Sequence, residues 1–111
     1  MKYQEVLPIN KNDAERIFAS DNLEKIREAL VAVSFYEEDW KWAQDECLKF
    51  LSHENNIISG LAATCLGHIA RVHGKIERGK VLKELNSRLN NLEIAGRIED
   101  AMSDIDIFVK N

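Results

Sequence analysis

Apolar side chains recur every three or four residues along most of the chain, which is the spacing of an amphipathic α-helix. Residues 57–73 (IISGLAATCLGHIARVH) are apolar around most of a helical circumference, so this segment is expected to be the central and most buried one. The pattern predicts six helices, over about residues 13–19, 22–35, 39–52, 57–73, 76–89 and 93–109.

Polar residues and glycine predict where these helices begin and end. Side chains that can accept hydrogen bonds from the first free N–H groups of a helix stand before three of the segments, at Asp13, at Ser20 or Asp21, and at Asp39. Gly74 suits the left-handed conformation that ends many helices. Pro8 disfavours a helix at the start of the chain, so residues 1–12 are expected to form an extended arm and residues 13–111 a single helical domain.

A stripe of four apolar or small positions appears three times when the sequence is shifted by 36 residues. The matching sets are Ile26, Ala62 and Ile98; Ala29, Cys65 and Ala101; Leu30, Leu66 and Met102; and Val33, Ile69 and Ile105. Stripes in a helical protein can coincide by chance, but a true repeat predicts helix pairs that stack and share one core. We therefore predict an all-α fold of stacked antiparallel helix pairs, about three pairs in all.

The segment WAQDECLKFLSHENNIISGLAATCLGHIARVHG resembles a HEAT-type repeat, in which a short turn joins two helices and the second helix carries small residues, here Ala62, Ala63, Leu66 and Gly67. The resemblance is good over residues 40–74 and weaker over residues 13–36 and 76–109, and the usual first-helix proline and Asp-x-x-Val-Arg turn are missing. The small size, the acidic balance and the segment CLGHIARVHG also resemble short helical immunity proteins of bacterial toxin–immunity systems, including contact-dependent growth inhibition (CDI). This second resemblance implies a protein that binds a cognate toxin, often a nuclease, and blocks it.

The composition indicates a globular domain. The 111 residues are 45% hydrophobic and 31% charged, which is too apolar for a disordered tail. No apolar run approaches the roughly 18 residues of a membrane span, and the N-terminal MKYQEVLPINKND lacks the apolar centre of a signal peptide, so we expect a cytoplasmic protein with no membrane contact. Cys47 and Cys65 lie on apolar helix faces and are expected to be buried free thiols.

The sequence offers no convincing catalytic or metal-binding set. His68 and His73 lie about 140° apart around one helix axis, so they cannot share a ligand. Residues 74–80 (GKIERGK) have the spacing of a phosphate-binding loop, but Val81 stands where Ser or Thr would hold magnesium. We therefore expect no enzyme activity, no cofactor and no metal.

The mild net charge of −4 argues against nucleic-acid binding, but acidic residues cluster in two segments. Residues 37–46 hold five carboxylates against Lys41, and residues 93–111 hold five against Arg97 and Lys110. Solvated helix faces would account for both clusters. The alternative is an acidic surface that attracts a basic protein partner.

The second helices of stacked pairs commonly line a binding surface, and Glu24, Glu28, Thr64, His68, Asp100 and Asp104 lie on them off the core stripe. Trp40 and Trp42 are about 200° apart on one helix, so both cannot face the core, and the exposed one would be an interface anchor. The alternative is that Trp40 folds over the end of the second helix beside Tyr36. The candidate partner-binding residues are Glu28, Glu37, Glu38, Asp39, Trp40, His68, Glu99, Asp100 and Asp104.

These observations favour an immunity (antitoxin) protein that neutralises a cognate toxin domain by covering its active site. The competing hypothesis is a HEAT-like scaffold or adaptor that binds several proteins. In either case the expected partner is a protein, a basic one for an immunity protein, and the free chain is expected to be a monomer.

Overall fold

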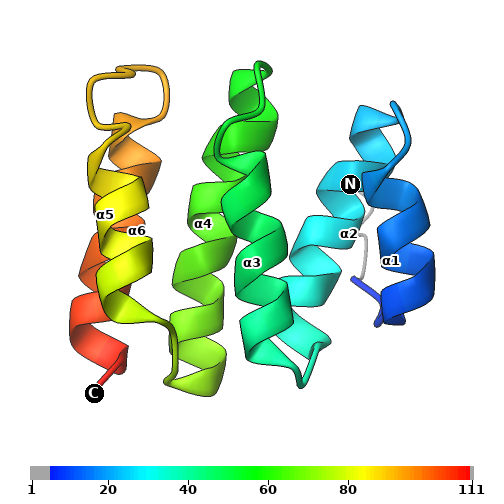
Figure 1. Cartoon of the computed structure of the whole chain (residues 1–111), viewed down its shortest axis with the longest axis horizontal. Helices are drawn as coiled ribbons and strands as arrows, with labels where there is room; N and C mark the ends of the chain where they lie inside the picture. The colour runs from blue at the N-terminus through cyan, green and yellow to red at the C-terminus, as the bar shows by residue number, and fades with distance from the viewer. Residues whose placement is uncertain (1–5, 111) are drawn as a thin grey trace, which may run out of the picture.

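A computed structural model describes residues 6–110 of the chain and shows six α-helices and no strand in that range. Figure 1 shows α2, α4 and α6 side by side in one layer, with α3 and α5 in front of α4 and α6. The all-α fold of six helices predicted from the sequence is confirmed. The helices are α1 (Lys11–Phe18), α2 (Leu23–Tyr36), α3 (Trp40–Phe50), α4 (Asn56–His73), α5 (Arg78–Asn86) and α6 (Ala95–Phe108).

Asparagine side chains, and not the predicted residues, cap the first two helices. The N–H of Asp13 donates to Asn10 Oδ1 at 2.8 Å, so α1 begins earlier than predicted. At α2 the cap is Asn22, and not Ser20 or Asp21 as predicted. Several adjacent residues have side chains that can cap a helix, and the sequence pattern does not distinguish them. The predicted cap at the start of α3 and the left-handed Gly74 at the end of α4 are both confirmed.

Residues 6–10 precede α1 and lie beside α2. The hydroxyl of Tyr36, the last residue of α2, donates to the carbonyl oxygen of Val6 at 3.1 Å. Of the arm expected over residues 1–12, residues 1–5 lie outside the described part of the chain.

The repeated stripe forms the core. Helix α4 packs against α2, α3 and α6, and its stripe lies between the other two copies. Among the twelve stripe positions, only Met102 is partly exposed and the others are buried. The burial predicted from the 36-residue periodicity is therefore confirmed at these positions.

Two glycines let α6 approach α4 closely. A Cβ atom at Gly67 would lie 2.8 Å from Asp104 Oδ2 and 3.3 Å from the Cα of Ala101. A Cβ atom at Gly60 would lie 2.8 Å from the Cδ of Arg97. These glycines therefore seat two charged side chains of α6 against the surface of α4.

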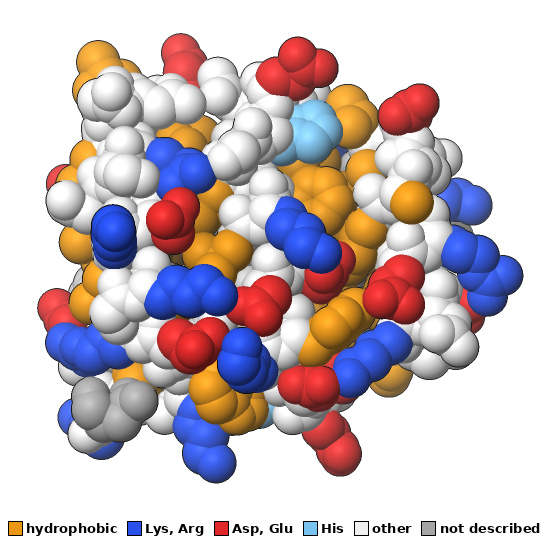
Figure 2. All heavy atoms as spheres, in the orientation of Figure 1, with side chains coloured by type: hydrophobic (Ala, Val, Ile, Leu, Met, Phe, Trp, Pro, Cys, Tyr) orange, Lys and Arg blue, Asp and Glu red, His pale blue; other side chains and the backbone are white. Residues whose placement is uncertain are grey.

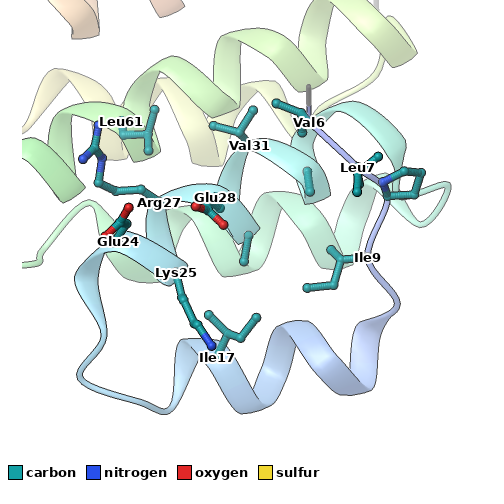
Figure 3. Close-up of a pocket in the computed structure, with 13 residues that line it drawn as sticks. Val6, Leu7, Ile9, Ile17, Glu24, Lys25, Arg27, Glu28, Val31 and Leu61 are labelled. Atoms are coloured by element: carbon teal, nitrogen blue, oxygen red, sulfur yellow. The ribbon is translucent and has the colours of Figure 1, made fainter. Parts of the chain in front are cut away.

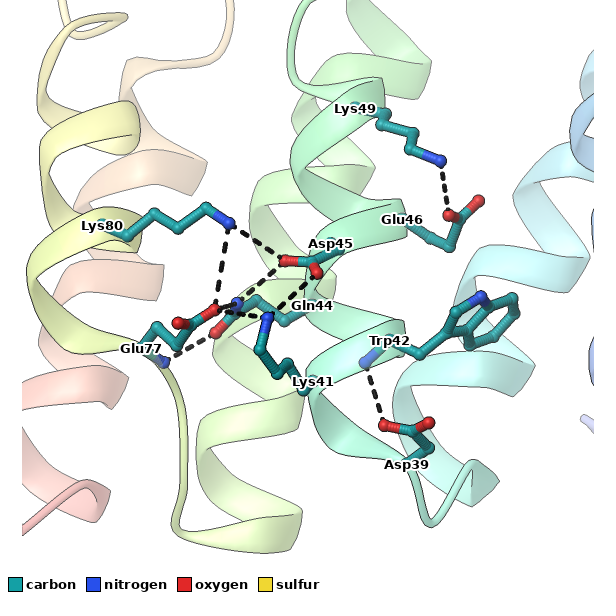
Figure 4. Close-up of polar contacts among 9 residues, drawn as sticks. All are labelled: Asp39, Lys41, Trp42, Gln44, Asp45, Glu46, Lys49, Glu77 and Lys80. Atoms are coloured by element: carbon teal, nitrogen blue, oxygen red, sulfur yellow. Dashed lines mark hydrogen bonds and ion pairs between the residues drawn. The ribbon is translucent and has the colours of Figure 1, made fainter.

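A buried glutamine joins α3 to the start of α5. Gln44 is fully buried, and its Oε1 accepts a hydrogen bond from the Glu77 N–H at 2.6 Å while its Nε2 donates to Glu77 Oε1 at 2.6 Å. Glu77 precedes α5 and makes no side-chain cap of its own. Gln44 therefore satisfies the backbone at the start of α5 and fixes α5 against α3 (Figure 4).

Candidate functional site

The two faces of the molecule differ in how their charges are paired. Within the described residues, every ion pair includes a residue of α1, α3 or α5, or one immediately beside these helices. Figure 2 shows this face, where Lys and Arg side chains alternate with Asp and Glu. The acidic residues here are largely neutralised within the chain.

The densest set of ion pairs links α3 and α5 (Figure 4). Lys41 Nζ lies 3.4 Å from Asp45 and 3.3 Å from Glu77, and Lys80 lies 3.3 Å from the same aspartate. Hydrogen bonds from Gln44 and Lys41 lower the pKa of Glu77. These contacts hold two repeats together and leave this cluster few free charges for a ligand. Lys80, from the segment with phosphate-loop spacing, takes part in this cluster.

The opposite surface is formed by the outward sides of the second helices, and we call it the α2/α4/α6 face. In α2, Glu24, Glu28, Val31 and Phe35 recur at helical spacing opposite the buried stripe. In the described part of the chain, no ion pair involves a residue of this face. The face comprises Glu24, Glu28, Val31, Phe35, Leu61, Thr64, His68, Arg71, Arg97, Asp100, Asp104 and Ile107.

Side chains from α2 and α6 meet over the middle of α4. The Phe35 ring of α2 stacks on the His68 imidazole, with ring centroids 4.6 Å apart and planes at 29°. From the other side, Arg97 Nη1 donates to Thr64 Oγ1 at 3.1 Å. The centre of the face is thus a layer of side chains held by three helices.

The structure brings together four of the predicted site residues and separates a fifth. Glu28, His68, Asp100 and Asp104 all lie on the α2/α4/α6 face. Glu99 lies about 100° around α6 from its neighbour Asp100, on the side that carries the contact of α6 with α5. The expected acidic strip is also less uniform than predicted, because two arginines of the face, Arg71 and Arg97, stand among its carboxylates.

The acidic turn before α3 has structural roles. Asp39 Oδ1 caps α3 by accepting from the Trp42 N–H at 3.1 Å, and its Oδ2 accepts from Lys11 Nζ at 2.6 Å. These two hydrogen bonds lower the pKa of Asp39. Glu37 accepts from the Asp39 N–H at 2.9 Å, while Glu38 is exposed. Of the three carboxylates predicted here, two are therefore engaged within the chain.

The expectation that one tryptophan would be exposed is wrong. Trp40 and Trp42 are both half-buried and both pack against the edge of the core. Lys11 Nζ lies 5.4 Å from the centroid of the Trp42 ring, a cation–π distance. Side chains of α1 cover part of α3 on the side of Trp42, because Lys11 lies over the Trp42 ring and the Phe18 ring lies 5.2 Å from that of Phe50.

An open groove of about 600 Å³ adjoins this face, between residues 6–9 and α2 (Figure 3). Its floor is aliphatic, with Ala29, Val31 and Ala32 of α2 and Leu61 of α4. The charged side chains of the groove come from the first two turns of α2, at Glu24, Lys25, Arg27 and Glu28. A groove with this lining can accept an apolar side chain of a partner.

Two further findings concern the described residues. In residues 6–110, no group of three or more His, Cys, Asp or Glu side chains is placed to hold a metal ion, and no helix has the length and apolar character needed to cross a bilayer. Cys47 and Cys65 are buried free thiols, as predicted. The Cys65 sulfur and burial raise the pKa of Cys47 well above its usual value.

The architecture defines a small all-α domain of stacked helix pairs, with one face rich in ion pairs and an opposite face that takes part in no ion pair within residues 6–110. No protein-family profile and no curated protein sequence matches the chain. Among solved structures, it matches a chain of a CDI complex from Cupriavidus taiwanensis LMG 19424, with a TM-score of 0.86, 31% sequence identity and 97% coverage of both chains. This chain belongs to the same protein family as that component of the complex. The resemblance to proteins of CDI systems expected from the sequence is confirmed.

Sequence reasoning missed several residues of the face, above all Phe35, Arg97 and Ile107. Phe35 and Ile107 are large apolar residues that lie off the repeated stripe, and this displacement was the signal that could have identified them. No such signal exists for Arg97, because its position over Gly60 depends on how α6 packs against α4.

Proposed function

We propose that this chain is the immunity protein of a CDI toxin–immunity pair, and that it binds the toxin domain and covers its active site. The observation that carries the proposal is the match, over nearly the whole chain, to a component of a CDI complex. The α2/α4/α6 face is the proposed contact surface, because its charged residues form no ion pair among the described residues.

The size of this face suits the proposal. The principal extents of the molecule are 31 × 30 × 29 Å, so one side of it is wide enough for an interface that buries roughly 800 Å² per partner. Carboxylates outnumber arginines on the face, which favours a basic toxin surface such as the phosphate-binding site of a nuclease. The free chain would be a monomer in the cytoplasm, where the incoming toxin would act.

The test is co-expression with the toxin domain encoded beside this chain. Inducing the toxin alone should stop growth, and inducing it together with this chain should restore growth, whereas an unrelated helical protein of similar size should not. The purified pair should form a stable one-to-one complex in which the toxin no longer turns over its substrate. Unrestored growth together with the absence of a complex would refute the proposal, and binding to several unrelated proteins would favour the adaptor hypothesis.

A further inference from the structure

Exposed large apolar side chains concentrate at one end of the molecule. Helices α2, α4 and α6 run in the same direction, so their C-terminal ends lie together (Figure 1). Of the nine exposed large apolar residues in the described range, five lie at this end: Phe35, Tyr36, Val72, Ile107 and Phe108. Single exposed apolar residues are ordinary on a protein surface, but a cluster of them marks a binding surface.

Phe35 of α2 and Val72 of α4, together with the His68 ring on which Phe35 stacks, form the centre of this cluster. Phe35 is 40% exposed and is held by its stack on His68, and Val72 follows that histidine by one helical turn and is 48% exposed. Tyr36 does not belong to this centre, because its hydroxyl donates a hydrogen bond to the carbonyl oxygen of Val6. An aromatic side chain held in place by packing loses little entropy on binding, which is the property of interface anchors.

Carboxylates without ion pairs border this centre on both sides. Glu28 lies two turns before Phe35 on α2, and Asp104 lies on α6 against Gly67, the residue next to His68. Within residues 6–110 neither carboxylate has an ion-pair partner, whereas Asp39, Asp45 and Glu77 on the other face all have one. A partner that brings basic groups to these positions replaces water with an opposite charge.

We infer that the toxin docks on this end of the α2/α4/α6 face, with an apolar side chain against Phe35, His68 and Val72 and basic side chains at Asp104 and Glu28. The inference rests on the proposed function and names the site and the chemistry of the toxin surface that fits it. Arg71 also stands on this part of the face, so the basic groups belong at its two margins and not over its middle.

The test measures the dissociation constant of the complex with the toxin domain encoded beside this chain. Phe35→Ala should raise it at least tenfold, because it removes the anchor ring. Val72→Lys should do the same without touching the stacked pair, because it places a charged group where the apolar side chain of the toxin packs. Asp104→Asn should weaken binding severalfold and reduce its dependence on salt.

Two exposed apolar residues away from this cluster provide matched controls. Ile57 lies at the other end of α4 and is 61% exposed, and Leu92 precedes α6 and is 86% exposed, so Ile57→Ala and Leu92→Ala should change the constant less than twofold. Circular dichroism and the urea midpoint establish that each variant is folded.

Three results would overturn the inference. The first is binding within twofold of the native chain for both Phe35→Ala and Val72→Lys. The second is a loss of binding affinity for Ile57→Ala as large as the loss for Phe35→Ala. The third is a dimer of the free chain that Val72→Lys converts to a monomer, which would assign the cluster to a second copy. Failure of the native chain to bind the toxin at all would instead refute the proposed function.

Discussion

Replacing Gly67 with alanine tests whether the close approach of α4 and α6 depends on a missing side chain. Alanine in place of glycine within a helix stabilises a protein by about 0.5–1 kcal/mol when there is space for the methyl group. At Gly67 there is not, because the new Cβ would lie 3.3 Å from the Ala101 Cα and 2.8 Å from Asp104 Oδ2. The carboxylate can rotate away, but the backbone of α6 must shift, and overpacking of this kind costs about 1–3 kcal/mol. The net expectation is a loss of roughly 1–2 kcal/mol in the free energy of unfolding.

Gly96 provides the control on α6 itself. Nothing lies within 4 Å of a Cβ atom built there, so Gly96→Ala should leave the protein as stable as before or more stable by up to about 1 kcal/mol. Both variants are measured by urea denaturation, followed by circular dichroism and by the fluorescence of the two tryptophans. The reasoning would be refuted if Gly67→Ala were as stable as Gly96→Ala.

Three further predictions concern the core and the paired face. Gln44→Ala should lower the free energy of unfolding by about 1–3 kcal/mol in urea, because it removes both hydrogen bonds of a buried side chain and leaves the Glu77 N–H at the start of α5 without its partner, and a loss below about 0.5 kcal/mol would contradict this role. Hydrogen bonds from Lys11 and from the α3 backbone lower the pKa of Asp39, so its stabilising effect is present above the unfolded pKa near 3.8 and is lost as the pH falls through the lower folded pKa. Asp39→Asn should therefore unfold more easily than the native chain at about pH 7 and equally easily at about pH 2, and a difference that persists in acid would show that the ion pair is not its cause. Cys47 and Cys65 are fully buried, so iodoacetamide should modify both thiols only in denaturant, and mass spectrometry of the native protein that shows rapid modification would contradict their burial.

The sequence alone determined the helical fold and most of the core. Helical spacing is local information, since residues three or four apart meet on one side of a helix wherever that helix lies. The stripe at Ile26, Ala62 and Ile98 could be found in this way, and all three residues are buried. Helix ends were less accessible, because Asn10 and Asn22 competed with neighbouring residues that cap equally well.

The tertiary structure decided which charged and aromatic residues are free to bind. Asp39 and Asp100 are both acidic residues on polar helix positions, yet one is bound to Lys11, which lies 28 residues away in the sequence, and the other has no ion pair among residues 6–110. Likewise α1 covers part of α3 and half-buries Trp42, whereas Phe35 remains accessible on His68. These outcomes depend on the positions of one helix relative to another, which the spacing of residues along a single helix does not encode.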